Sequence, residues 1–163
     1  MRTKTKIVRK VSACPAGLTL IEILVVLAIM GLLAVLAVNS FGNFSTVQAL
    51  QAGSGNAASL IARAQSESVA GTGGAPHGVH IASTTLTLFT GSSFATGTVS
   101  QILVLTGTVA VVQTNLAGGG ADVVFDQITG ATEEPGNIVL QVGGNTAYSK
   151  TITISATGVV SVQ

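Results

Sequence analysis

The pattern of apolar and polar positions divides the chain into parts with different periodicity. Residues 18–38 form an apolar run that carries one charge, Glu22. Residues 39–70 have apolar side chains at helical spacing, and residues 71–163 alternate apolar and polar positions in short blocks separated by glycine. A period near 3.6 favours a helix and a period of two favours a strand. The pattern predicts a long N-terminal helix followed by a β-rich globular domain, with residues 1–17 as a polar leader.

The apolar run has the length of a membrane span. A helix over residues 18–38 would extend about 30 Å, which is the thickness of a bilayer core. Five of the seven basic residues lie within the first ten positions, immediately before this run. Because Lys and Arg flanking a span stay in the cytoplasm, we expect a single-pass inner-membrane protein in contact with lipid, with its C-terminal domain outside the cytoplasm.

An amphipathic helical segment is predicted to continue from the span. Its first part has an apolar stripe at three-residue spacing: Phe41, Phe44, Val47 and Leu50. The sequence "GSGN" at residues 53–56 is expected to interrupt or kink the helix, since glycine disfavours helix interiors. A second stretch then places Ala57, Leu60, Ile61 and Ala64 on one face. Arg63 and Glu67 are four residues apart and suited to an ion pair.

The remainder is rich in Val, Ile, Thr and Gly, which predicts strands joined by turns. We expect eight strands, near Val79–Ile81, Thr85–Phe89, Thr98–Leu105, Val109–Gln113, Val123–Gln127, Ile138–Val142, Thr151–Ser155 and Val159–Val162. The last two predict a C-terminal hairpin around a Thr-Gly turn.

The N-terminus has three interpretations. A secretory signal peptide would have a shorter apolar run and a small-residue cleavage site after it. A lipoprotein signal ending at Cys14 would need an apolar stretch before the cysteine, where the sequence is "MRTKTKIVRK". Cleavage after Gly17 instead creates a new N-terminus at Leu18, whose α-amine is the nearest cation for Glu22, from the same helix or a neighbouring one. A carboxylate inside hydrocarbon costs about 2.5–3.5 kcal/mol and usually has a partner.

The stretch "GLTLIEILVVLAIMGLLAVLAV" resembles the class III signal of type IV pilins and type II secretion pseudopilins. The resemblance implies that a prepilin peptidase cleaves after Gly17 and that Leu18 becomes the methylated N-terminus. It also implies that Glu22 sets the register of the subunit in a filament built with an inner-membrane assembly platform. Two positions depart from the common pattern: Leu18 stands where phenylalanine is commonest, and Asn39 stands where many members have a helix-breaking proline.

A second resemblance concerns the end of the helix. The sequence "LIARAQSESVAGTGGAPHGVHI" at residues 60–81 resembles the GspH/FimT group of minor pseudopilins and pilins. The implied fold class is α+β and pilin-like, with a long hydrophobic N-terminal helix packed on a C-terminal antiparallel β domain. The implied function is a structural subunit, a minor pilin or pseudopilin, that polymerises with copies of itself or with related subunits in a type IV pilus or a type II secretion pseudopilus.

Two other functions stay open as alternatives. One is a DNA-uptake minor pilin of the FimT type. However, beyond residue 17 only Arg63 and Lys150 oppose six carboxylates, so this part has a net charge of −4 and nucleic acid is an improbable partner. The other is a membrane-anchored binding module that never polymerises, which predicts no cleavage at Gly17.

Candidate chemical groups in the domain give no catalytic or metal site. His77 and His80 form H-x-x-H without the further ligands that zinc needs. The acidic residues Asp122, Asp126, Glu133 and Glu134 are spaced like a strand and a turn rather than a calcium loop. The triple glycine at 118–120 lacks the Lys of a phosphate loop, and G-x-S-x-G does not occur. We therefore expect no enzyme activity, cofactor, metal or small-molecule substrate.

Overall fold

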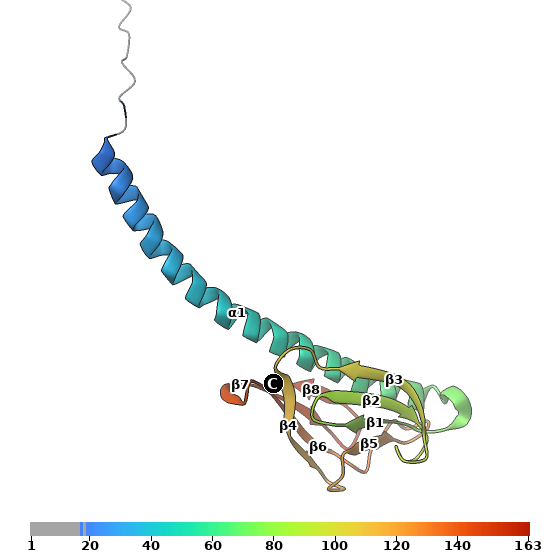
Figure 1. Cartoon of the computed structure of the whole chain (residues 1–163). Coiled ribbons are helices and arrows are strands. Elements are labelled where there is room, and N and C mark those ends of the chain that lie inside the picture. The colour runs from blue at the N-terminus through green and yellow to red at the C-terminus, as the bar shows by residue number, and fades with distance from the viewer. Residues whose placement is uncertain (1–16, 18) are drawn as a thin grey trace, which may run out of the picture. The chain divides into compact units, whose positions relative to one another are not determined.

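The computed structural model describes Gly17 and residues 19–163, apart from the side chains of residues 37–43. The chain divides into two units, Met1–Ser40 and Phe41–Gln163. Helix α1 (Leu20–Val69) begins in the first unit and ends in the second (Figure 1). The expected leader, apart from Gly17, and Leu18 lie outside the described residues.

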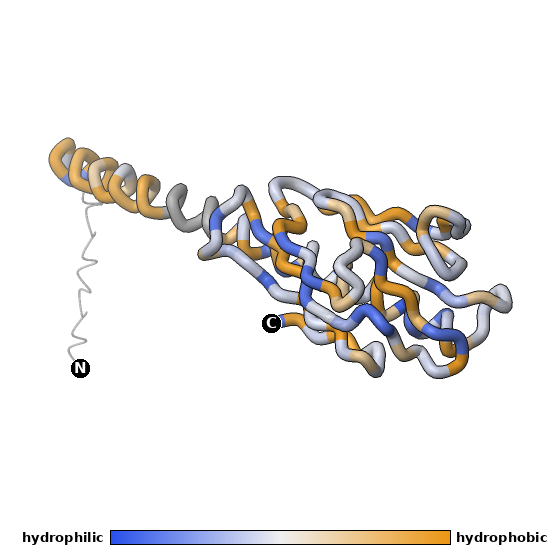
Figure 2. Tube along the Cα trace, turned by 90° about the horizontal axis from the view of Figure 1, so that it is seen from below, coloured by the Kyte–Doolittle hydropathy of each residue, from blue (hydrophilic) through white to orange (hydrophobic). Residues whose placement is uncertain are grey.

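The first part of α1 is exposed along its whole described length. Every described side chain from residue 19 to residue 36 is exposed, including large apolar ones such as Leu20, Leu27 and Leu36. Figure 2 shows this stretch as mostly hydrophobic. No helix in the described part of the chain combines the length and the apolarity that a membrane span requires.

The predicted interruption at residues 53–56 was wrong, because α1 runs through them as one helix. Gly53 is buried against Val109, and a Cβ at Gly53 would lie 3.2 Å from Val109 Cγ1. The Ser54 hydroxyl is buried and donates to the Gln51 carbonyl oxygen at 3.1 Å, within the same helix. A glycine costs helix stability of about 1 kcal/mol, and close packing against a strand offsets that cost here.

The end of α1 presents a narrow buried stripe to the β domain. The predicted face of Ala57, Leu60, Ile61 and Ala64 is confirmed. The buried stripe also includes Leu50, Gly53 and Ser54 before this face and Ser68 after it. The residues of the predicted earlier stripe are helical, and its described members Phe44 and Val47 are 61% and 46% exposed. The Phe41 side chain lies outside the described residues. Burial therefore starts at Leu50.

After a short 3-10 helix, η1 (Thr72–Gly74), eight strands form two antiparallel sheets in the described chain. Sheet A has the order β3-β2-β1-β5, with β1 (His77–Ile81), β2 (Thr85–Thr90), β3 (Thr98–Val104) and β5 (Asp122–Phe125). Sheet B has the order β4-β6-β7-β8, with β4 (Val109–Leu116), β6 (Gly136–Val142), β7 (Asn145–Ile154) and β8 (Val160–Val162).

All eight predicted strands are confirmed in existence, and their ends differ by a few residues. β7 is the largest difference, because it begins at Asn145 rather than near Thr151. The C-terminal hairpin is confirmed, with Ile154 opposite Val160 and the Gly158 N–H donating to the Ser155 carbonyl at 2.9 Å. Gly158 has φ +81°, so the turn requires glycine.

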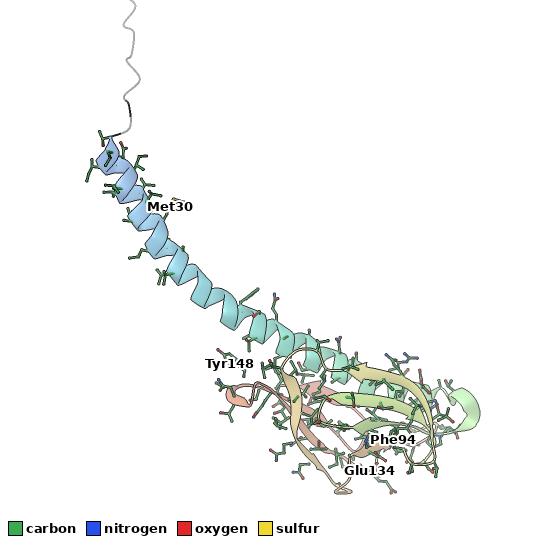
Figure 3. All side chains as sticks on the ribbon, in the orientation of Figure 1. Met30, Phe94, Glu134 and Tyr148 are labelled. Carbon is green, nitrogen blue, oxygen red and sulfur yellow. The ribbon has the colours of Figure 1, made fainter. Side chains whose placement is uncertain are left out.

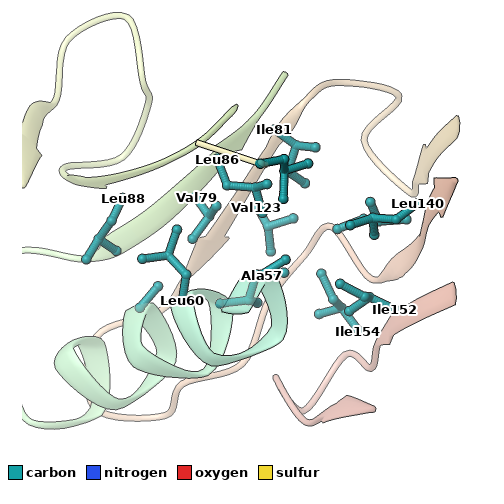
Figure 4. Packing of buried hydrophobic residues seen from close by; sticks show 14 of the residues in the cluster. Ala57, Leu60, Val79, Ile81, Leu86, Leu88, Val123, Leu140, Ile152 and Ile154 are labelled. Atoms are coloured by element: carbon teal, nitrogen blue, oxygen red, sulfur yellow. The ribbon is translucent and has the colours of Figure 1, made fainter. Parts of the chain in front are cut away.

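One hydrophobic core joins the end of α1 to both sheets. Figure 4 shows Ala57 and Leu60 of α1 facing Val79 and Val123 of sheet A, with Ile152 of sheet B beside them. These five side chains are at most 3% exposed. The fold is thus α+β, with the C-terminal half of the helix packed on an antiparallel β domain.

Candidate functional site

The start of α1 is capped by Thr19. The Glu22 N–H donates to Thr19 Oγ1 at 3.3 Å and to the Thr19 carbonyl oxygen at 3.1 Å. The Ile23 N–H also donates to that carbonyl, at 3.3 Å. A threonine N-cap satisfies N–H groups that the first turn leaves without a partner in the helix. Sequence reasoning missed Thr19, although the T-x-x-E spacing from Thr19 to Glu22 is the signature of a helix start.

Gly17 and Glu22 flank this cap. Gly17 is exposed and not helical, and a Cβ at this position would have no other atom within 4 Å. The Glu22 side chain is exposed in the first turn of α1, where the helix dipole favours a negative charge. No side-chain partner of Glu22 lies among the described residues. The roles predicted for Gly17, Leu18 and Glu22 stay predictions.

Apolar side chains surround the helix beyond Glu22. The exposed large apolar residues are distributed around α1 rather than along one stripe, and Figure 3 shows them projecting outward, with Met30 labelled. A helix that is apolar all round is normally buried. The described residues supply no apolar surroundings for this surface.

The two histidines of the H-x-x-H motif lie apart in different surroundings. His80 is half-buried, and its Nδ1 lies 2.6 Å from Asp122 Oδ1. The Phe94 ring stacks on His80 with centroids 4.1 Å apart, and the Phe94 N–H donates to Asp122 Oδ2 at 3.3 Å. Phe89 meets Phe94 edge-on at 5.7 Å. This cluster holds the connection of residues 91–97 against sheet A, and the Phe94 ring covers one face of the His80 imidazole.

His77 is 3% exposed and joins the start of β1 to the end of α1. Its N–H donates to Ser68 Oγ at 2.8 Å, and its Nε2 lies 3.7 Å from Glu67 Oε2. The Arg63–Glu67 ion pair is confirmed, with 2.7 Å between Arg63 Nε and Glu67 Oε1. In the described chain, His77 Nδ1 is buried with no hydrogen-bond partner. These contacts hold the end of α1 against the start of β1.

Three of the four acidic residues border one cavity, and Glu134 is hydrogen-bonded there. The Glu134 carboxylate accepts from the Val124 N–H and the Thr132 hydroxyl, both at 3.2 Å. Glu134 borders a cavity of about 220 Å³ with Asp126 and Glu133. Within residues 19–163, as far as their side chains are described, no three His, Cys, Asp or Glu side chains gather in a group that could hold a metal ion.

Comparisons with known proteins agree with this arrangement. The family model "Prokaryotic N-terminal methylation motif" matches residues 14–38. No curated protein matches the chain in sequence. A crystal structure of the type IV minor pilin FimU from Pseudomonas aeruginosa is similar to the chain, with a TM-score of 0.51 and 14% identity. The similarity covers 70% of this chain and 92% of that one, and it shows the fold.

Proposed function

We propose that this type IV pilin-like chain is a minor structural subunit of a type IV pilus or a type II secretion pseudopilus, which it joins through the first half of α1 after cleavage behind Gly17. The observation that carries the proposal is the apolar surface that surrounds α1 up to residue 36, with Glu22 as its one charge. The match of residues 14–38 to a methylation motif supports it.

The exposed apolar surface supplies the driving force for assembly. Fully burying one Leu or Ile side chain stabilises by about 1.5–3 kcal/mol. We propose that membrane lipid covers the helix first, with the β domain outside the cytoplasm, and that the helices of other subunits replace the lipid in the filament. An inner-membrane assembly platform would make this exchange, after a prepilin peptidase has removed the leader.

Glu22 would fix how far each subunit rises along the filament. A carboxylate in an apolar helix bundle is stable only with a partner. The α-amine of Leu18 on a neighbouring subunit is the cation that cleavage creates. Since a shift by one residue moves a helix by about 1.5 Å and rotates its side chains, one pairing of amine and carboxylate selects one register.

Glu22→Ala tests this proposal in cells that assemble the filament. The variant should accumulate in the membrane and disappear from sheared filaments, because its helix has lost the group that sets the register. Glu133→Ala is the matched control, since Glu133 is exposed on the β domain and its side chain has no partner in the described chain. Incorporation of Glu22→Ala at the wild-type level would contradict the assembly role of Glu22.

A further inference from the structure

Strand β3 is an open edge of sheet A. It pairs with β2 alone, and six of its seven residues are exposed. The Leu105 N–H donates to the Thr84 carbonyl, and the register places Leu103 opposite Leu86. Because hydrogen-bonded and non-hydrogen-bonded pairs alternate in an antiparallel ladder, the backbone groups of Ile102 and Val104 point away from β2. They have no partner in the described chain.

Two of the other three edges are short, and the third, β4, has one outward N–H bonded and a register shift. β5 has four residues, and the Glu134 carboxylate accepts from its Val124 N–H. β8 has three residues. On β4, the Val111 N–H donates to the Ser83 carbonyl at 2.7 Å, and the register shifts beside it. Natural proteins protect sheet edges by such means.

β3 has little of this protection. Its sequence, TVSQILV, contains no charge and no proline. A register shift opposite Leu88 and Phe89 disturbs the first half of the strand, so the regular open edge covers residues 101–104. A free edge of this kind is a template for another strand.

A cavity of about 330 Å³ lies beside this edge, between β3 and α1. Leu103 and Gln101 line it from the strand, and Leu60, Arg63, Asn56 and Ser59 line it from the helix. Leu103 and Gln101 are two residues apart and point to the same face of the sheet. The cavity thus has an apolar part at Leu60 and Leu103 and a polar part at Arg63 and Gln101.

In the described part of the chain, Arg63 is the one charged residue that lines the cavity, and Glu67 is its ion-pair partner. Its Nε donates to Glu67 and its Nη1 donates to Gln101 Oε1, both at 2.7 Å. The side chain is 56% exposed, and the remaining guanidinium N–H groups are unbonded within the described residues. A guanidinium binds carboxylates through paired N–H groups, so it favours an acidic partner here.

We propose that the β3 edge and this cavity form a strand-addition site for an extended, acidic segment of another protein. The added strand would pair with residues 101–104 and direct alternate side chains into the cavity. An apolar side chain would meet Leu60 and Leu103, and a carboxylate two residues away would meet Arg63. This site lies on the β domain and does not depend on processing at Gly17 or on assembly through α1.

The probe is a labelled peptide, acetyl-Thr-Leu-Thr-Glu-Thr-Val-Thr-amide, titrated against the full chain in detergent by fluorescence anisotropy. It should bind saturably, and a matched peptide with Lys in place of Glu should bind at least about tenfold more weakly. Arg63→Gln should abolish this difference between the peptides. N-methylation of alternate peptide amides should remove binding to the wild-type protein.

Val104→Pro tests the edge itself, because it removes an outward N–H and leaves the pairing with β2 intact. This variant should lose the peptide, whereas Val104→Thr should keep it, and thermal unfolding should show both variants folded. The proposal is overturned if neither peptide binds the folded wild-type chain, or if the N-methylated peptide binds equally well. Self-association that Val104→Pro abolishes, without peptide binding, would also overturn it and assign the edge to a second copy.

Discussion

The two halves of α1 are parts of one helix with opposite surfaces. Residues 20–36 are apolar apart from Glu22 and exposed on all sides, whereas the half after Leu50 is mixed in polarity and buries one stripe against the β domain. The buried stripe uses small residues such as Gly53, Ala57 and Ala64, which let the helix approach the sheets closely. The first half is richer in large branched side chains.

This difference shows where each half finds its partner. The second half has its partner within the chain, so its sequence is fitted to one set of neighbours. The first half has none in the described chain, so its surface suits any apolar environment, and under the proposed function Glu22 would supply its specificity. Substitutions of the same chemistry in the two halves should therefore have different effects on the stability of the β domain.

The largest expected difference comes from removing a large apolar side chain. Ile61→Ala should lower the free energy of unfolding of the β domain by about 2–5 kcal/mol, because Ile61 is fully buried in the core. Leu27→Ala, in the exposed half, should change it by less than about 0.5 kcal/mol. Denaturant unfolding of the full chain in detergent measures both. Equal losses would show that the first half also packs against the β domain.

A glycine in each half gives a second matched pair. Gly53→Leu should destabilise the domain by about 1–3 kcal/mol, since even a Cβ there lies 3.2 Å from Val109 Cγ1. Gly31→Leu should leave domain unfolding unchanged, because nothing lies within 4 Å of a Cβ at Gly31. A tolerated Gly53→Leu would mean that the helix does not need its close approach to β4.

The cap of the first half should have a local effect. Thr19→Ala should weaken the first turn of α1 by about 1 kcal/mol, and Thr19→Ser should preserve it. Faster hydrogen exchange at the Glu22 amide in the alanine variant, with unchanged exchange in the β domain, is the expected result. Unchanged exchange at Glu22 would show that Thr19 does not cap the helix.

The smallest effect belongs to the ion pair on the second half. A double-mutant cycle of Arg63→Ala and Glu67→Ala should give a coupling energy of about 0.3–0.5 kcal/mol, because the Arg63 side chain is 56% exposed and the pair spans one helical turn. Added salt should reduce the coupling. A coupling above about 2 kcal/mol would indicate that the pair also stabilises the buried His77.

The strands were predictable because alternation of apolar residues and glycine turns are local signals. The early start of β7 was missed because residues 145–150 are mostly polar, and only pairing with β6 makes them a strand. Gly53 lies within α1 beside Val109, which is distant in sequence, so this contact has no local signal.

The residues of the candidate site also differ in whether the sequence alone reveals them. The motif around Gly17 and Glu22 is contiguous, so the sequence contains it entirely, and the cap at Thr19 was equally available from its spacing. The cluster of His80, Phe94 and Asp122 brings together three segments that are distant in sequence. Such contacts have no local sequence signal.

The most direct test of the central claim is the intact mass of the full chain after co-expression with a prepilin peptidase. The predicted result is a chain that begins at N-methylated Leu18, and N-terminal sequencing of a Gly17→Ala variant should show no cleavage. Gly31→Ala is the matched control and should be processed like the wild type. A wild-type chain that still begins at Met1, where a known prepilin is cleaved, would contradict the assembly role proposed for the first half of α1.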